Sequence, residues 1–536
     1  MSREDEDRLY YFTGSESCTD GGLVQAKHEI QREFFLTQLP DSVEKGARGY
    51  DDDDDYESKG PHGKSPVEMK QTLLRYLATD LVIQKAIHGE VSILQTDLKW
   101  FGTSLSHSTI LAICKFFGIP AFWLDFFHKF LGPPIQWSDD SHNPEPVRIR
   151  KRGVQMATAF EQFFGEIILF PLDLAVNLKA DGMHLFRMHD DLCMSGRPSS
   201  VGKAWKVIQE YCALMGLEFN DSKTGSAHLH NKKNNRNSKP VNLPKGNVSF
   251  GFLRLEPEIG EWIIDRDQVD RHTQQLRKQL AKCTSIFSWI QTWNSCIGRF
   301  FSRTFGETAN CFGGAHADSI LQMHKEIQQE IFGQQKITDH LRGLIRDKFG
   351  AAVELPDAFF FFPEEMGGLG LRNPFINLLV SREDLIESPG QRMQAYLDNT
   401  RAAYEKDKAA FQALSPYERR RRARDFVGLN TSAALGELTY EDYTRHQEIV
   451  SLELEAVFED LMSVPSPSDI IPSEVLNEID WPAWQKLESE QKWLIQLYAQ
   501  RVVDTFGGLK MVDKTLLPLG IMTLLKNQKV SWQAVL

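Results

Sequence analysis

Two adjacent acidic residues between two short apolar runs constrain the fold of this chain more than any other feature. Residues 184–196 read His-Leu-Phe-Arg-Met-His-Asp-Asp-Leu-Cys-Met-Ser-Gly, a pattern that predicts a hairpin with Asp190 and Asp191 at its turn. A third acid, Asp97, ends the β-branched run that begins at Val91. Taken alone, an Asp-Asp pair in a turn is more often structural, because aspartate favours turns.

The three carboxylates predict a metal site if the strands that carry them meet. Like charges a few Å apart raise one another's pKa unless a cation compensates. Carboxylate oxygens suit Mg²⁺ or Mn²⁺, and two such ions about 3.5–4 Å apart can stabilise the attacking and leaving oxygens of a phosphoryl transfer. We therefore expect Asp97, Asp190 and Asp191 to form a divalent-cation site.

Helical patterns alternate with these strands and predict an α+β fold. A buried helix is expected over 154–170, and Pro171 should kink or end it. Another helix should be capped by Ser199 or Ser200 and stopped by Gly216. The other expected elements are a strand at 248–255 and helices from about residue 66 and at 108–117, 120–131, 267–283, 285–303 and 316–333.

Length, charge and cysteine usage set broader limits. A chain of 536 residues predicts about three or four domains. The net charge is −12, but residues 66–350 hold 34 basic and 29 acidic side chains, which neither predicts nor excludes a nucleic-acid partner. Seven cysteines without a Cys-x-x-Cys pair indicate a reducing compartment and no structural zinc. The acidic N-terminus and the lack of a long apolar stretch predict a soluble intracellular protein, cytoplasmic or nuclear, without a membrane partner.

Five sequence blocks resemble, in their order, the palm of reverse transcriptases. They are the strand ending in Asp97, Arg152-Gly-Val-Gln at the start of a helix, Met188-His-Asp-Asp, Gly216-Leu-Glu-Phe-Asn-Asp-Ser-Lys-Thr, and Phe250-Gly-Phe-Leu. The resemblance implies a right-hand polymerase palm, a small antiparallel sheet with helices, with shortened fingers, a helical thumb and a helical C-terminal region. Over residues 65–536 the chain is most similar to the domesticated reverse-transcriptase-related cellular proteins of fungi.

The composition and the resemblance together predict six segments. They are a largely disordered acidic segment at 1–65, a palm with a remnant of the fingers at 66–255, a helical thumb-like region at 256–350, a helical extension at 351–463, a linker at 464–472 and a C-terminal helical segment at 473–536.

The resemblance also implies a role for each site residue. Asp97 and Asp190 would hold the metal ions, and Asp191 would orient or assist. Lys223 would neutralise charge on the pyrophosphate leaving group, although a solvated loop lysine is the alternative. The residues that would contact the nucleotide are Lys99, Phe101, Gly102, Arg152 and Gln155. Solvent exposure of Lys99 and Arg152 remains an alternative.

The implied activity is that of a nucleotidyltransferase like an RNA-directed DNA polymerase. It would join nucleoside triphosphates on an RNA or DNA primer-template, and a second copy of the chain is a further candidate partner. Two other functions stay open. One is a weakly active or inactive protein that binds nucleic acid or acts as a scaffold, and the other is a two-metal phosphodiesterase.

Three departures from the reverse-transcriptase pattern affect what we expect of the activity. Met188 replaces the usual tyrosine before the acid pair, and Gln155 replaces a proline. Only 96 residues precede Asp97, so the basic fingers residues that grip a triphosphate are reduced to the candidates Lys70, Arg75 and Lys85. We therefore expect weak nucleotide binding and a preference for Mn²⁺.

A further departure concerns the choice of sugar. Reverse transcriptases place an aromatic side chain about five positions after the first catalytic aspartate, where it collides with a ribose 2′-hydroxyl. Gly102 occupies this position and has no side chain to exclude the hydroxyl. The sequence therefore predicts that ribo- and deoxyribonucleotides are both accepted. A register shift that makes Phe101 the gate, with Gly102 serving only a tight turn, is the alternative.

Overall fold

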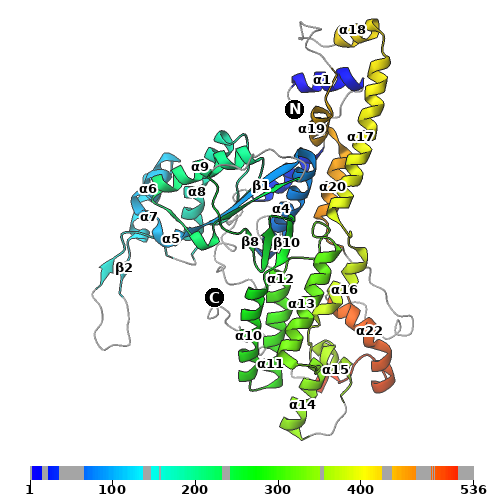
Figure 1. Cartoon of the computed structure of the whole chain (residues 1–536). Coiled ribbons are helices and arrows are strands. Elements are labelled where there is room, and N and C mark those ends of the chain that lie inside the picture. The colour runs from blue at the N-terminus through cyan, green and yellow to red at the C-terminus, as the bar shows by residue number, and fades with distance from the viewer. Residues whose placement is uncertain are drawn as a thin grey trace. The chain divides into compact units, whose positions relative to one another are not determined.

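The chain forms two compact units in a computed structural model (Figure 1). The first unit consists of Met1–Ser249, Leu255–Glu261 and Pro389–Met462, and the second of Phe250–Arg254, Trp262–Ser388 and Ser463–Leu536. The described residues are 3–14, 22–34, 66–136, 147–155, 158–231, 242–350, 355–424, 437–465, 484, 485, 487 and 489–516.

A five-stranded sheet organises the first unit around β1 (Glu90–Lys99). The strand order is β4-β5-β1-β6, and β7 pairs with β1 along its other edge, with all four pairings antiparallel. The other strands are β4 (Phe186–Met188), β5 (Asp191–Gly196), β6 (Glu218–Phe219) and β7 (Gly225–His230). Strand β1 is central in this sheet and buried along most of its length.

Helices α8 (Ala159–Lys179) and α9 (Pro198–Met215) lie side by side, and α9 packs on β1 and β5 (Figure 1). Their apolar faces share one core with α5–α7. The shorter elements of this region are α5 (Phe101–Ser104), α6 (His107–Phe116), α7 (Ala121–Leu131), β2 (Pro134–Ile135), β3 (Arg148–Ile149) and η1 (Asp221–Lys223). This core fixes the end of β1 that carries Asp97.

Helices from both ends of the first unit's sequence complete it. Helix α4 (Pro66–His88) packs on β1, and α17 (Pro389–Ala413) packs on α4. The remaining helices of the unit are α1 (Arg3–Thr13), α2 (Leu23–Phe34), α18 (Pro416–Arg424), α19 (Tyr440–Val450) and α20 (Leu452–Met462). Within the segment 1–65, α1 and α2 are helices that bury apolar side chains. The rest of that segment lies outside the described residues.

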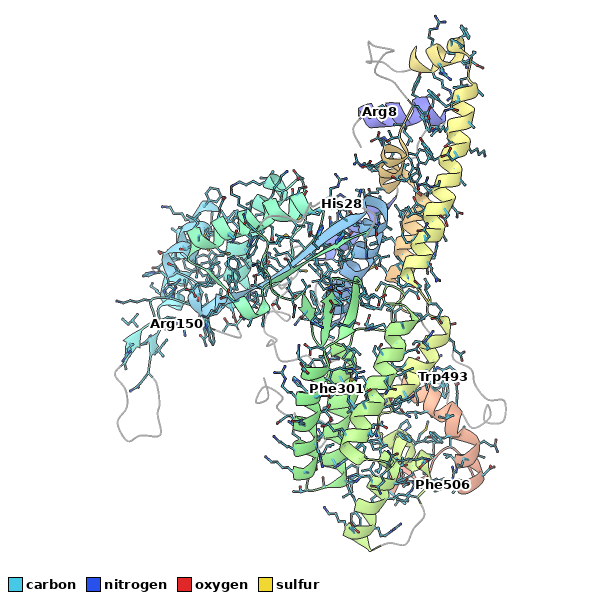
Figure 2. All side chains as sticks on the ribbon, viewed as in Figure 1. Arg8, His28, Arg150, Phe301, Trp493 and Phe506 are labelled. Carbon is cyan, nitrogen blue, oxygen red and sulfur yellow. The ribbon has the colours of Figure 1, made fainter. Side chains whose placement is uncertain are left out.

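The second unit is helical, as the apolar spacing of its sequence predicts. Phe301, marked in Figure 2, is 1% exposed and belongs to the core of this unit. Its elements are α10 (Arg266–Lys282), α11 (Ile286–Trp293), the π-helix η2 (Asn294–Phe301), α12 (Ser302–Thr304), α13 (Gly314–Phe332), α14 (Ile337–Phe349), α15 (Asp357–Phe361), η3 (Glu364–Met366), α16 (Pro374–Asp384), α22 (Ser489–Phe506) and η5 (Lys514–Leu516). The strands β8 (Ser249–Phe250), β9 (Leu253–Glu256) and β10 (Glu261–Ile264) form a separate three-stranded sheet.

The structure differs from the sequence predictions at two helix ends. Helix α8 does not end at Pro171 but continues to Lys179, because packing of its apolar face on the core outweighs the local cost of a proline. Helix α9 begins at Pro198, after an N-cap residue without a side-chain cap. Ser200 is not that cap, since its hydroxyl donates to Asp181 at 2.7 Å. The predicted stop at Gly216 is confirmed, because this glycine takes a left-handed conformation with φ 68°.

The overall class is α+β, with helices around small antiparallel sheets. Among the described helices, none combines the length and the apolar character needed to cross a membrane. The six segment boundaries inferred from the sequence stay predictions.

Candidate active site

The three acids gather at one end of the five-stranded sheet. In the antiparallel pair of β1 and β5, Asp97 lies directly opposite Asp191. Met188 of β4 also pairs with Asp191, so His189 and Asp190 alone make the turn. The carbonyl oxygen of Asp190 accepts a hydrogen bond from the backbone of Leu98 at 3.3 Å. The prediction that the strands bearing these acids are neighbours is confirmed.

Asp97 is held by two side chains that follow β6. Asn220 Nδ2 donates to Asp97 Oδ2 at 2.9 Å, and the Lys223 ammonium lies 3.5 Å from Asp97 Oδ1. The backbone of Asn220 also donates to the carbonyl oxygen of Asp97 at 2.8 Å. The side chain of Asp97 is 12% exposed and that of Lys223 is 60% exposed. Lys223 can therefore reach a bound substrate while Asp97 stays fixed.

The electrostatics of the cluster favour a cation. Burial and the charge of Asp97 raise the pKa of Asp190 to about 6. Burial, the hydrogen bond to Asp97 and the charge of Asp190 raise the pKa of Asp191 to about 6 as well. Burial and the neighbouring carboxylates thus destabilise the charged forms of Asp190 and Asp191, and a divalent cation would relieve this.

The donor set matches hard cations, since the acids of the cluster offer oxygen atoms only. No group of three or more His, Cys, Asp or Glu side chains in the described part of the chain is arranged to hold a metal ion by itself. This finding does not conflict with a magnesium site, because Mg²⁺ is usually held by one or two carboxylates together with water and substrate phosphates.

A buried ion network that the sequence analysis did not identify supports the turn. The guanidinium of Arg187 donates to both oxygens of Glu166, at 3.1 and 2.9 Å, and to both oxygens of Asp173, at 2.8 Å each. The same side chain donates to the carbonyl oxygen of His189 at 3.3 Å. Two acids seven residues apart on an otherwise apolar helix are the signal that could have indicated a buried basic partner.

His189 is the strained residue of the turn. Its φ is 59°, in the left-handed region, and its ring packs on that of Phe101 with centroids 5.3 Å apart. A Cβ atom at Gly165 would lie 2.6 Å from His189 Cε1, so the ring fits only above a glycine. Burial lowers the pKa of His189, which keeps the imidazole neutral beneath the acids.

The residues after β1 divide into buried and exposed positions. The ring of Phe101 is 2% exposed and belongs to the core. Gly102 is buried, and its carbonyl oxygen accepts from Val154 at 2.8 Å. The left-handed residue of this turn is Trp100, with φ 53°, and its side chain is 73% exposed. Lys99 is exposed at the end of β1.

Arg152 ties together three parts of the fold. Its guanidinium donates to the carbonyl oxygens of Ser104 and Gly216. The neighbouring Gly153 has a φ of 86°, and a Cβ there would lie 2.6 Å from the carbonyl oxygen of Thr103, so the close approach of these two backbone segments requires a glycine. Arg152 therefore has a clear structural part. Gln155 is exposed, and its backbone carbonyl oxygen accepts a hydrogen bond from the Thr158 hydroxyl at 2.9 Å.

The three basic candidates for a triphosphate grip lie on α4. Arg75 donates to the Thr72 hydroxyl at 3.2 Å, and Lys85 donates to the carbonyl oxygen of Ile259 at 3.4 Å. Lys70 is exposed. The structure brings none of the three into a contact with the acid cluster among the described residues, so Lys223 is the cation that lies next to it.

Comparisons with known proteins give weak similarities. No protein-family model matches the chain, and no curated protein matches its sequence. Apo telomerase from Candida tropicalis is 13% identical over 75% of this chain and 60% of its own, with a TM-score of 0.32. The same enzyme bound to a TWJ fragment of telomeric RNA is 12% identical over 73% of this chain and 57% of its own, with a TM-score of 0.31. Telomerase from Candida albicans bound to a TWJ fragment of telomeric RNA is 12% identical over 61% of this chain and 55% of its own, with a TM-score of 0.24.

The chain thus spans less than two thirds of each of these telomerase chains. Superpositions at these TM-scores do not establish a common fold. We therefore base the function on the acid cluster and the residues around it.

Proposed function

We propose that the chain is a reverse-transcriptase-like nucleotidyltransferase with a right-hand polymerase palm. The observation that carries the proposal is the antiparallel pairing of Asp97 with Asp191, which puts Asp190 in the adjoining two-residue turn. Two carboxylates on neighbouring strands and a third in the turn could hold the two metal ions of a phosphoryl transfer.

Asp97 and Asp190 would hold Mg²⁺ or Mn²⁺, with Asp191 assisting. When bound, the ions would neutralise phosphate charge and stabilise the attacking and leaving oxygens. Lys223 would supply a positive charge and a proton to the pyrophosphate leaving group, because its ammonium is largely exposed yet next to Asp97. Asn220 keeps the Asp97 carboxylate in place. The substrates would be nucleoside triphosphates and an RNA or DNA primer-template.

One observation favours the alternative of an inactive nucleic-acid-binding protein. The Asp97 carboxylate already has partners in Asn220 and Lys223, so one acid of the cluster is partly neutralised without a metal ion. In that case the fold would serve as a scaffold and the acids would only stabilise the turn.

The deciding experiment is primer extension by the purified full chain with Mg²⁺ or Mn²⁺, with Asp190→Ala as the control. Extension by the wild type and its loss in Asp190→Ala support the proposal. Equal extension by both proteins, or none by either under both metals, would reject it.

A further inference from the structure

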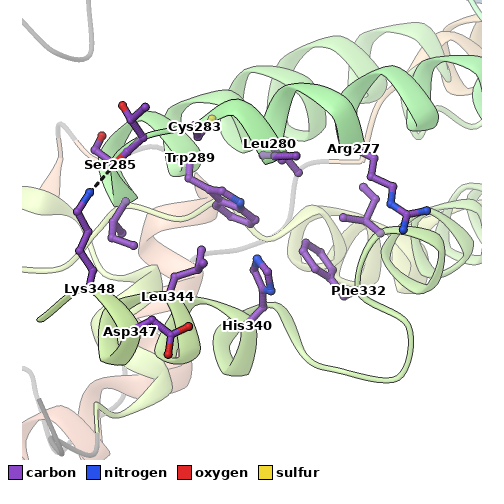
Figure 3. A pocket seen from close by; sticks show the side chains of 14 residues that line it. Arg277, Leu280, Cys283, Ser285, Trp289, Phe332, His340, Leu344, Asp347 and Lys348 are labelled. Atoms are coloured by element: carbon purple, nitrogen blue, oxygen red, sulfur yellow. Dashed lines mark hydrogen bonds between the residues drawn. The ribbon is translucent and has the colours of Figure 1, made fainter. Parts of the chain in front are cut away.

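A cavity of about 500 Å³ lies within the second unit, between the ends of four helices (Figure 3). The C-terminal ends of α10 and α13 and parts of α11 and α14 line it, together with the turn at 283–285. Its volume falls within the range of about 300–1,000 Å³ that is usual for small-molecule sites. It lies in a different unit from the acid cluster, so its occupant does not depend on the proposed catalysis.

Three aromatic rings form the inner wall of this cavity. The ring centroids of Trp289, Phe332 and His340 lie 5.3–6.0 Å apart, with planes tilted by 40–44°. Leu280 and Leu344 complete the apolar surface (Figure 3). A wall of this kind suits a flat ring, because aromatic side chains stack on the face of a base.

The same wall offers unused hydrogen-bonding groups. Within the described residues, neither the Trp289 indole nor the His340 imidazole makes a hydrogen bond. Burial lowers the pKa of His340, so a neutral imidazole presents one donor and one acceptor. A purely apolar ligand would leave these groups unpaired, whereas a heteroaromatic ring could pair with them.

Charged side chains stand at both ends of the cavity. Arg277 stands at one end, and Asp347 and Lys348 stand at the other (Figure 3). Lys348 donates to the carbonyl oxygen of Thr284. Arg277 and Asp347 are exposed, and neither makes a hydrogen bond in the described part of the chain. A matching ligand has an anion at one end, a flat ring in the middle and an N–H donor at the far end.

We propose that this cavity binds a single nucleotide whose base carries an exocyclic amino group. The base lies against Trp289, Phe332 and His340, its amino edge faces Asp347, and its phosphate pairs with Arg277. An aromatic amino acid does not fit as well, because its ammonium and carboxylate share one carbon and cannot reach both ends. The nucleotide can be free or part of a single strand, since both present the same base and phosphate.

The test uses the full chain carrying Asp190→Asn, without divalent cations, so that the acid cluster contributes no metal-dependent binding. Adenosine monophosphate is titrated and tryptophan fluorescence and heat are measured, with purine riboside monophosphate as the ligand that lacks the amino group and has no other donor on that edge. We expect tighter binding of adenosine monophosphate. Arg277→Gln should weaken it about tenfold, because a charge-assisted hydrogen bond is lost. Lys278→Gln, next to it on α10 and outside the cavity, is the matched control and should bind as the parent does.

Two further variants sharpen the test. Asp347→Ala should remove the preference for adenosine monophosphate over purine riboside monophosphate. Leu344→Trp should abolish binding by filling the cavity while the unfolding temperature stays close to that of the parent. If Leu344→Trp does not fold, the comparison of Arg277→Gln with Lys278→Gln decides alone. A single-stranded oligoadenylate that competes with the mononucleotide indicates a strand as the source, and binding of the mononucleotide alone indicates a free nucleotide. No binding of either at millimolar concentrations, or equal binding by Arg277→Gln and Lys278→Gln, overturns the proposal.

Discussion

Arg187 forms a two-pronged ion pair with Glu166 while its own side chain is 5% exposed and that of Glu166 is 2% exposed. The same guanidinium donates to the carbonyl oxygen of His189, the residue before Asp190. A buried pair on α8 and β4 therefore sets the position of the turn that carries the acid cluster. Its geometry links the stability of the fold to the arrangement of the site.

Arg187→Met should destabilise the first unit strongly. Removing the guanidinium leaves the carboxylates of Glu166 and Asp173 buried without a cation, which costs about 3–5 kcal/mol. Denaturant unfolding measures the loss. The control is Arg382→Met, whose ion pairs with Asp318 and Glu387 lie at the surface of the second unit and contribute about 1 kcal/mol or less each. Equal losses in the two variants would contradict a supporting role for Arg187.

Asp97→Asn and Asp190→Asn should each reduce nucleotide incorporation to about 1% or less of the wild-type rate, because each would remove a proposed metal ligand and several kcal/mol of transition-state stabilisation. Single-turnover primer extension checks this. Asp181→Asn is the control, since Asp181 pairs with Lys203 and Ser200 away from the cluster and its loss should leave the rate unchanged. Incorporation that survives in Asp190→Asn would show that the acids are structural.

The expected metal preference follows from the small number of basic side chains next to the acid cluster that could bind a triphosphate. Lys223 is the basic side chain that contacts the cluster, and the candidates on α4 have other partners or are exposed. We expect weak nucleotide affinity and faster extension with Mn²⁺ than with Mg²⁺, because Mg²⁺ demands a more exact octahedral geometry. Extension rates measured over a range of nucleotide concentrations with each metal test it. Tight nucleotide binding with Mg²⁺ alone would show that another group supplies the grip.

Both sugar series should be incorporated at similar rates. Gly102 presents no side chain, and the Phe101 ring is buried against His189, so neither is expected to block a 2′-hydroxyl. Side-by-side incorporation of ribo- and deoxyribonucleotides measures the selectivity. A Gly102→Tyr variant that keeps the wild-type unfolding temperature should favour deoxyribonucleotides. The idea fails if the wild type strongly prefers deoxyribonucleotides, or if the folded variant still accepts both.

The second unit should lose stability in acid through two buried histidines. Burial lowers the pKa of His316 and of His324 from 6.5 to about 4. Below about pH 6.5 the unfolded chain therefore binds protons that the folded chain does not bind. The free energy of unfolding falls as the pH falls from about 6.5 to about 4. Each histidine should lower the free energy of unfolding by about 2 kcal/mol at about pH 5. In chemical unfolding at several pH values, His316→Gln should show a shallower loss than the wild type over this range, and an unchanged slope would contradict the assignment.

Local sequence determined much of the secondary structure. The apolar spacing predicted α10 to within one residue at each end and α13 to within two, because one buried face repeats every turn of a helix. The hairpin of β4 and β5 was predictable because two apolar runs flank a two-residue turn. Gly216 stopped α9 because glycine adopts the left-handed cap at low cost.

Only the tertiary structure decided which of these elements support the site. Arg187 and Glu166 are 21 positions apart in the chain, and Asn220 and Asp97 are 123 apart. The paired residues of β1 and β7 are up to 140 positions apart, as for Glu90 and His230. Arg152 illustrates the difference: its sequence context suggested a phosphate contact, whereas the fold engages its guanidinium with two backbone carbonyls. Local propensity cannot encode such contacts, because burial and long-range pairing select among the partners that a charged side chain could take.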